Sequence, residues 1–372
     1  MNLPGAILQT VTDGVQERVA TQNAALPLPS LPVRRHLIST FLCSMILYLV
    51  AWIVVFWAAI ALPSLEDICC FTVLGDKHRI LEQASSPKMI ITGGSNVLFG
   101  VDGEKIGRKF NMKVVNMGLC LMFPLPYLFE EVKDTIKSGD IVVLSPEYSL
   151  YSTDMENLSI MRNILEGYPR AIEWILRSNS CSLEEKGRVL FHLRTLGLQK
   201  LEYAFKHIRQ IVSGRCRWTY GKPNSGLLVL NSKNLDSCGD LTWHLTQPIP
   251  RDGMERKISI RVPKQIDDHT ASEINKFGEY CRAKGAEFVL IPPSIPDTMY
   301  KRSKISIDRL VIESRKRLTV PILASPERYA FSDSMIFGGH YHLDKIGREL
   351  RSQRMIEDLQ STVDEVRSRS RK

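Results

Sequence analysis

The sequence lacks the signatures of several protein classes. None of its eight cysteines has the spacing of a metal site, so we expect no metal ion, and nothing in the sequence predicts a cofactor. No nucleic-acid motif accompanies the net charge of +9, so nucleic acid is not an expected partner. The sequence also has no internal repeat and no low-complexity tract. At 372 residues, the chain is long enough for one large folded domain, or two modest ones, with a sizeable core.

Charged side chains are missing from residues 37–65. A bilayer core needs about 20 apolar residues, and a buried helix of a soluble protein is rarely this long and this uniformly apolar. We therefore predict a transmembrane helix over residues 37–63, preceded by a lead of residues 1–36. A cleaved signal peptide fits less well, because the apolar tract is too long and begins too far from the N-terminus.

The flanking charges indicate which side of the membrane each part occupies. Two arginines precede the apolar tract and two acidic residues follow it, so the positive-inside rule places the lead in the cytoplasm. We expect a single-pass protein of the inner (cytoplasmic) membrane, with its C-terminal domain on the periplasmic or extracellular side. Seven cysteines then lie on the outer side, and Cys216 with Cys238 is the one disulfide pair that we predict.

Beyond residue 86 the sequence alternates between strand and helix patterns, which is typical of an α/β domain with a parallel sheet. The predicted strands cover residues 89–92, 113–116, 141–144, 287–291 and 320–323. The predicted helices cover residues 101–110, 124–137, 267–284 and 305–317, with a last helix that continues past Leu359. The domain is expected to span residues 86–350, and residues 351–372 form a C-terminal helix with a basic tail.

Residues 152–262 interrupt the alternation and are predicted to be a mainly helical insertion. Apolar residues recur at helical spacing in residues 155–179, 182–195 and 199–213. Two short strand candidates, residues 227–230 and 258–262, follow in a more irregular stretch.

Small and polar residues follow three of the predicted strands. The first is followed by Gly93-Gly94-Ser95-Asn96, the second ends in Asn116-Met117-Gly118, and Ser145-Pro146-Glu147-Tyr148 follows the third. Ligands of parallel α/β sheets bind at the carboxyl ends of the strands, so these residues are expected to converge. Ser95 is a candidate nucleophile there, although the same turn also suits an ordinary helix start capped by Ser95 or Asn96.

The order of these motifs resembles the SGNH (GDSL-type) hydrolase superfamily. The resemblance rests on residues 93–96, on residues 116–118 and on His342-Leu343-Asp344-Lys345-Ile346-Gly347, which is similar to membrane-anchored SGNH-like proteins of polysaccharide and teichoic-acid acylation. It implies a flavodoxin-like three-layer sandwich. It also implies that Ser95 is the nucleophile and an oxyanion donor, that Gly118 is a second oxyanion donor, and that His342 is the base.

The sequence departs from the family pattern twice. The family offers an asparagine to the oxyanion from its third block, where this chain has Glu147, a carboxylate that would oppose the oxyanion's charge. The family also has an aspartate three residues before the histidine, where this chain has Gly339. Asp333 is the candidate that replaces it in orienting His342, and otherwise it is a plain loop residue.

Several neighbouring residues have more than one possible role. Asn96, Glu147 and Tyr148 are candidate substrate-binding residues, although Asn96 also suits a helix cap and Tyr148 suits core packing. His340 is a rival to His342 as the base.

Two classes of function follow from these residues. The first is a membrane-anchored serine acyl-enzyme, an O-acetyltransferase or esterase, acting on the ester groups of cell-envelope or exported polysaccharide. The resemblance also implies a multi-spanning membrane acyltransferase as a partner that supplies the acyl group. The alternative is a catalytically inactive SGNH-like module that binds glycan or a membrane partner in an assembly.

Overall fold

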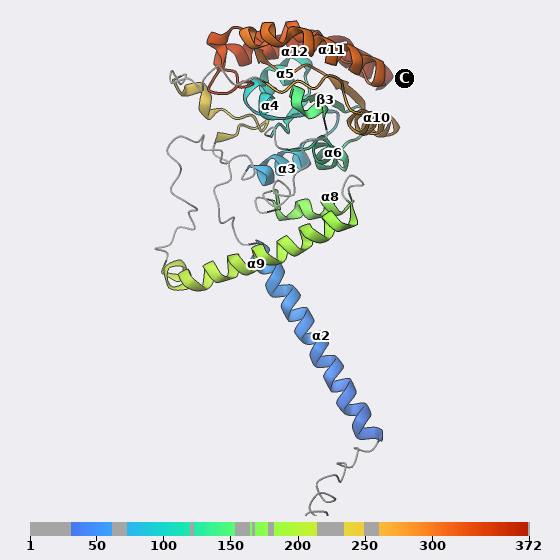
Figure 1. Ribbon diagram of the computed structural model, residues 1–372, viewed down its shortest axis with the longest axis vertical. Helices are drawn as coiled ribbons and strands as arrows, with labels where there is room; N and C mark the ends of the chain where they lie inside the picture. Colours follow the sequence, from blue (N-terminus) through green and yellow to red (C-terminus); the bar gives the residue numbers. More distant parts are fainter. Residues whose placement is uncertain are drawn as a thin grey trace, which may run out of the picture. The chain divides into compact units, whose positions relative to one another are not determined.

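The chain forms two compact units, residues 1–57 and 58–372, and each is described by itself. The computed structural model (Figure 1) describes residues 31–61, 73–119, 123–152, 164–165, 168–177, 182–213, 234–248 and 260–370. The first unit contains most of α2 (Leu31–Ala61). Residues His36–Ile60 of this helix are long and apolar enough to cross a membrane, as the missing charges predict.

A four-stranded parallel sheet forms the centre of the second unit. Its strands are β1 (Lys88–Gly93), β2 (Lys113–Asn116), β3 (Ile141–Ser145) and β4 (Glu287–Leu290), in the order β2-β1-β3-β4. The predicted fifth strand forms only an isolated bridge between Leu290 and Ile322. Pro321 interrupts this segment, and because proline has no N–H group it cannot donate to a strand ladder.

Helices cover both faces of the sheet, which is usual for parallel sheets. On one face, Met89 and Ile91 of β1 belong to a core with side chains of α5 (Gly103–Phe110) and α12 (Lys345–Ser370). On the other face lie α6 (Leu125–Lys133) and α10 (Asp268–Ala283). There Phe129 stacks on Phe277 at 4.3 Å between ring centroids, and Phe277 meets the edge of Phe288 from β4 at 4.9 Å.

The remaining described elements connect or extend these layers. The helices are α3 (Leu74–Gln83), α4 (Ser95–Gly100), α8 (Ile172–Arg177), α9 (Leu183–Val212) and α11 (Asp297–Arg317). The strands β5 (Ile295–Pro296) and β6 (Ala330–Phe331) form a separate parallel pair. Short 3-10 turns cover Tyr148–Tyr151, Pro169–Ala171, Trp243–Thr246, Pro326–Tyr329 and Asp333–Met335.

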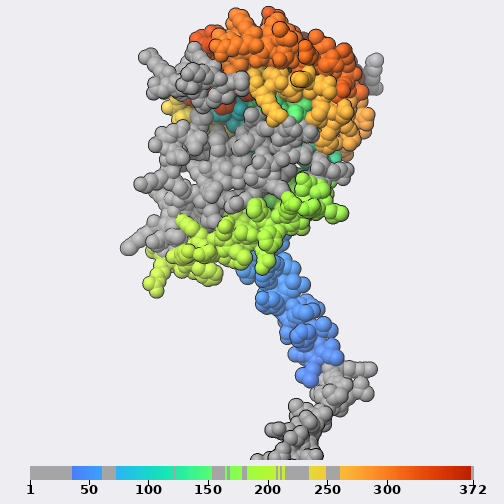
Figure 2. Space-filling model, in the orientation of Figure 1, coloured from blue at the N-terminus to red at the C-terminus, as the bar shows by residue number. Residues whose placement is uncertain are grey.

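Several predicted helices have different bounds in the structure, among them α6, predicted over residues 124–137, and α11, predicted over residues 305–317. The helix predicted over residues 101–110 is preceded by a separate helix, α4, and Asp102 starts α5 by accepting a hydrogen bond from the Lys105 N–H at 2.9 Å. The two helices predicted over residues 182–195 and 199–213 are one continuous helix, α9, because Gly197 between them is buried in the same packed face. Figure 2 shows α9, in green, at the surface of the second unit.

The predicted disulfide is not formed, because Cys238 is a free and buried thiol, while Cys216 lies outside the described residues. The strand candidate over residues 227–230 also lies outside them, and residues 260–262 of the other candidate are irregular. The C-terminal helix continues through Arg369, whose guanidinium pairs with Glu287 of β4 at 2.8 Å.

Candidate functional site

Ser95 is the first residue of α4 and directly follows the carboxyl end of β1. The chain makes this change of direction through Gly93, whose φ is +153° and whose added Cβ would lie 2.3 Å from the Ser145 carbonyl oxygen of β3. Only glycine fits there without a shift of the backbone. The turn therefore presents the half-buried Ser95 side chain at the sheet edge, as the sequence predicts.

Glu147 stabilises this turn by hydrogen bonds. Its fully buried carboxylate accepts hydrogen bonds from the Asn96 N–H at 3.0 Å and from the Ser95 hydroxyl at 3.3 Å, both on Oε1. Gly94, the N-cap residue of α4, has no side-chain cap of its own, so a carboxylate from another strand end supplies one. Burial raises the pKa of Glu147, while the two donors oppose that shift. The structure thus places Glu147 against the Ser95 turn, buried, rather than on an exposed binding surface.

Asn96 points into the interior and joins a buried network that the sequence analysis missed. Its Nδ2 donates to the Ser145 carbonyl at 2.8 Å, and its Oδ1 accepts from Arg351 of α12 at 2.6 Å. The Arg351 guanidinium also donates to the Ser145 hydroxyl at 2.9 Å and to the Asn96 carbonyl. Asn96 therefore fastens α4 to β3 and α12, and the fully buried Arg351 is the centre of that attachment.

The loop after β2 packs closely against α4. A Cβ added to Gly118 would lie 2.5 Å from the Leu98 nitrogen, so glycine is needed for this approach. The Gly118 N–H donates to Oδ1 of Asn116 at 2.8 Å, and Nδ2 of Asn116 donates to the Val97 carbonyl at 3.0 Å. The predicted oxyanion donor is therefore already hydrogen-bonded in this structure.

His342 lies against the same short helix. Its imidazole stacks on the ring of Phe99, four residues after Ser95, with centroids 4.0 Å apart and planes at 10°. Burial, together with His244 and His340, lowers the pKa of His342 to about 3, so the ring is neutral at physiological pH. Within the part of the chain that the structure describes, no hydrogen bond joins His342 to Ser95, although catalytic hydrogen bonds often tighten only when substrate binds.

The ring of His342 occupies the space that a side chain at position 339 would need. A Cβ added to Gly339 would lie 2.5 Å from Nδ1 of His342. Asp333 does not take over the orienting role in this structure, since its carboxylate accepts hydrogen bonds from the backbone N–H of Thr298 at 3.2 Å and from the Thr298 hydroxyl. Glycine at position 339 is thus explained locally by the packing of His342.

Tyr148 and His340 are the two remaining candidates. Tyr148 is buried at the start of a 3-10 turn next to Glu147, and burial raises the pKa of its hydroxyl. His340 is half-buried two residues before His342, and burial lowers the pKa of its ring. No group of three or more His, Cys, Asp or Glu side chains that could hold a metal occurs among the described residues.

Comparisons of the chain with protein-family models, with curated proteins and with solved structures find no match. What this site does must therefore be argued from its geometry.

The insertion contributes a second buried network beside α4. The carboxylate of Asp240 accepts from the Gly103 N–H at 2.6 Å, from Asn116 Nδ2 at 2.7 Å and from Arg348 of α12 at 2.9 Å. Burial raises the pKa of Asp240 to about 6, and nearby Asp236 adds to the shift, while these donors oppose it. Residues 234–248 are therefore an integral part of the packing around the site.

His244 extends this network toward His342. Its Nε2 lies 3.1 Å from the Phe99 carbonyl oxygen, and burial with nearby Arg348 lowers its pKa to about 4. Phe99 thus lies between two neutral imidazoles. The sequence does contain one signal for the polar residues that were missed on α12. Arg348, Arg351 and Ser352 recur at helical spacing with the apolar Met355 and Leu359, so all five lie on one face of that helix.

The burial of Lys77 gives stability a measurable pH dependence. Lys77 Nζ donates to the carbonyl oxygens of Asn116 at 2.7 Å and Gly239 at 2.8 Å, and burial lowers its pKa from 10.5 to about 8, against the attraction of Asp240. Between these pH values the unfolded chain keeps a proton that the folded chain has lost. The free energy of unfolding therefore increases as the pH rises from 8 to 10.5.

From pH 8 to 10.5 we expect the free energy of unfolding of the wild type to increase by about 3 kcal/mol more than that of Lys77→Met. Urea denaturation of the full chain in detergent micelles, repeated at each pH, measures the difference. Stability curves of the two proteins that run parallel from pH 8 to 10.5 would contradict the expectation.

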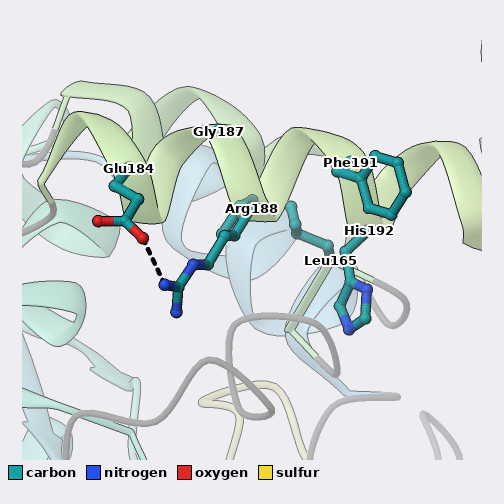
Figure 3. A pocket seen from close by; sticks show the side chains of 7 residues that line it. Leu165, Glu184, Gly187, Arg188, Phe191 and His192 are labelled. Carbon is teal, nitrogen blue, oxygen red and sulfur yellow. Dashed lines mark hydrogen bonds and ion pairs between the residues drawn. The ribbon is translucent and has the colours of Figure 1, made fainter.

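A cavity of about 700 Å³ lies elsewhere, along the N-terminal half of α9. Figure 3 shows Leu165 and the Phe191 and His192 side chains around it, with Glu184 and Arg188 paired on the same helix. Its lining contains none of the residues predicted for the site, so this cavity is separate from the Ser95 turn.

Proposed function

We propose that the chain is a membrane-anchored serine acyl-enzyme with an SGNH-like, flavodoxin-like domain, acting on O-acyl esters of cell-envelope or exported polysaccharide. The observation that carries the proposal is the Ser95 turn. A serine hydroxyl at the carboxyl end of a central strand is held by the buried Glu147 at 3.3 Å, and a neutral histidine stacks on the same short helix. The strand order β2-β1-β3-β4 is that of the first four strands of a flavodoxin-like sheet.

The proposed reaction has two acyl-transfer steps. Ser95 Oγ attacks the ester carbonyl carbon, its proton passes to His342, and the alcohol leaves after taking that proton. Water or a sugar hydroxyl then attacks the acyl-serine, which gives an esterase or an O-acetyltransferase respectively. The Ser95 N–H, at the start of α4, donates a hydrogen bond to the oxyanion. The Gly118 N–H provides a second donor if it first gives up its present hydrogen bond to Asn116.

The anchor suggests where the substrate is. Among the described residues, one helix long enough to span a membrane precedes the domain, and by the positive-inside rule the positive residues before it favour a domain outside the cytoplasm. Polysaccharide of the cell envelope is then the substrate within reach. A single span provides no route for an acyl donor, so a multi-spanning acyltransferase partner would supply the acyl group.

The second candidate is a catalytically inactive module that binds glycan or a membrane partner. The hydrogen bond from the Gly118 N–H to Asn116 favours it, because that N–H is not free for an oxyanion. The attachment of Asp333 to Thr298 also favours it, because no carboxylate in the part of the chain that the structure describes then orients His342.

Labelling by a fluorophosphonate probe tests the proposal. We expect the full chain in detergent micelles to be labelled, and Ser95→Ala to fall to background, because the probe reacts only with an activated serine. Ser332→Ala, at an exposed serine of the late loop, is the matched control and should keep the wild-type signal. Equal labelling of wild type and Ser95→Ala, or none of either, would favour the binding module.

A second measurement separates transfer from hydrolysis. Cells that carry Ser95→Ala should lose O-acetyl groups from the envelope polysaccharide if the enzyme transfers them, and should gain such groups if it removes them. An unchanged acetyl content would contradict both reactions on this substrate.

A further inference from the structure

We infer that the exposed face of α9 lies in the headgroup layer of a membrane that contains anionic phospholipid. The inference rests on the membrane anchor of the proposed function and is independent of the chemistry at Ser95. Its basis is the contrast between two faces of one helix, together with a contact at the end of the candidate span.

One face of α9 is packed against the rest of its unit. Val189, Leu193, Leu196 and Lys200 recur at helical spacing and are all buried. This face accounts for the apolar residues that hold the helix in place. The apolar residues on the other side need a different explanation.

The opposite face carries a second apolar stripe that is open to solvent. Phe191, Leu198, Phe205 and Val212 repeat every seven residues, so they lie on one side of the helix. Their side chains are 64%, 55%, 71% and 82% exposed, respectively. Large aromatic and aliphatic groups aligned along a whole helix and left in water mark an interaction surface.

The charge on α9 suits an anionic surface. The helix carries six lysines and arginines against three glutamates. Arg188, Arg194, Lys206 and Arg209 are exposed, so cations accompany the apolar stripe along the helix. An exposed apolar stripe with flanking cations is the pattern of helices that lie in a membrane interface.

A hydrogen bond places the middle of α9 at the end of the candidate span. Lys200 Nζ donates to the Ile60 carbonyl oxygen at 3.0 Å, and Ile60 is the last residue of the stretch able to cross a membrane. Both residues belong to the second compact unit. Because the end of a spanning segment lies at the level of the headgroups, this contact brings α9 to the same level.

A second copy of the chain fits the exposed stripe less well than a membrane does. Arg194 lies within the stripe, three residues after Phe191 and four before Leu198, so pairing of two such stripes would bury a cation from each copy. At a membrane, its long side chain reaches a lipid phosphate while its neighbours enter the acyl layer. We therefore assign the stripe to lipid.

Photo-crosslinking tests this assignment in the full chain. Benzoylphenylalanine replaces Phe205 in protein reconstituted into vesicles of phosphatidylcholine and tritiated phosphatidylglycerol. The matched control places the same group at Ile305 of α11, whose side chain is 78% exposed and lies outside α9. We expect at least about tenfold more lipid adduct from position 205 than from position 305. The same group at Leu198 provides a second position on the stripe.

Each outcome bears on a different part of the inference. Equal adduct at positions 205 and 305, or a cross-link of 205 to a second chain in place of lipid, would overturn it. Loss of the chain from the vesicles in alkaline carbonate would overturn the anchor and the inference with it. None of these three results changes the expected labelling of Ser95, so failure here is distinguishable from failure of the catalytic proposal.

Discussion

Replacing Gly94 by alanine is expected to lower the free energy of unfolding by about 3 kcal/mol or more. The φ of Gly94 is −86°, which alanine adopts readily, so the obstacle is contact rather than backbone conformation. An added Cβ would lie 1.9 Å from Oε2 and 2.3 Å from Cδ of Glu147. Because that carboxylate is fully buried, it has no open space into which to move.

The expected loss has two sources. Moving Glu147 breaks its hydrogen bond with the buried Asn96 N–H, which costs about 1–3 kcal/mol. Overpacking of the surrounding core adds about 1–3 kcal/mol. The same movement withdraws the acceptor of the Ser95 hydroxyl, so fluorophosphonate labelling of any folded fraction should also fall.

Gly187→Ala is the matched control for this substitution. Gly187 lies within α9, and an added Cβ there would meet nothing within 4 Å. Alanine in a helix interior should stabilise the chain by about 1 kcal/mol. Urea denaturation of both variants in detergent micelles measures the contrast, and a Gly94→Ala variant as stable as wild type would show that Glu147 is not held as described.

Replacing Arg351 by methionine is expected to destabilise the chain by about 3 kcal/mol. Methionine fills much of the same volume but cannot donate a hydrogen bond. The buried Asn96 Oδ1 would lose its charged donor at 2.6 Å and be left with the Ser145 hydroxyl at 3.0 Å, while the Asn96 carbonyl and the Ser145 hydroxyl would also lose their bonds from Arg351. Hydrogen bonds from a charged donor to buried groups are among the most costly to lose.

Two further variants define the cause. Arg369→Met removes an arginine from the same helix, but this side chain is largely exposed and pairs with Glu287 and Glu365 near the surface, so the expected change is below about 1 kcal/mol. Arg351→Lys keeps the charge but not the planar fork, and should restore part of the stability. A methionine variant at position 351 with the urea midpoint of Arg369→Met would refute the central role of Arg351.

Local patterns in the sequence were sufficient to predict several elements. The apolar runs of β1, β2, β3 and β4 are visible because strands buried on both faces are uniformly hydrophobic. The start of α11 was missed, because it begins at Asp297 in a polar stretch that follows Pro296, and an apolar pattern appears only later in that helix. Polar helix starts carry no hydrophobic period from which to predict them.

By itself, the sequence determined the charge-free span, the strands of the sheet and the place of Ser95 at a strand end, because each follows from residues that are neighbours in the chain. Only the tertiary structure decided what surrounds Ser95. Asn96 is hydrogen-bonded to Glu147, which is 51 residues away in the sequence, and to Arg351, which is 255 residues away. Asp240 and Arg348, which are also hydrogen-bonded, are 108 residues apart. Such pairs form because buried polar groups must find partners, and which partner each one finds depends on how the strands and helices pack. The Ser95 turn is thus a local feature, whereas the carboxylate and the arginine that are hydrogen-bonded to it are products of the fold.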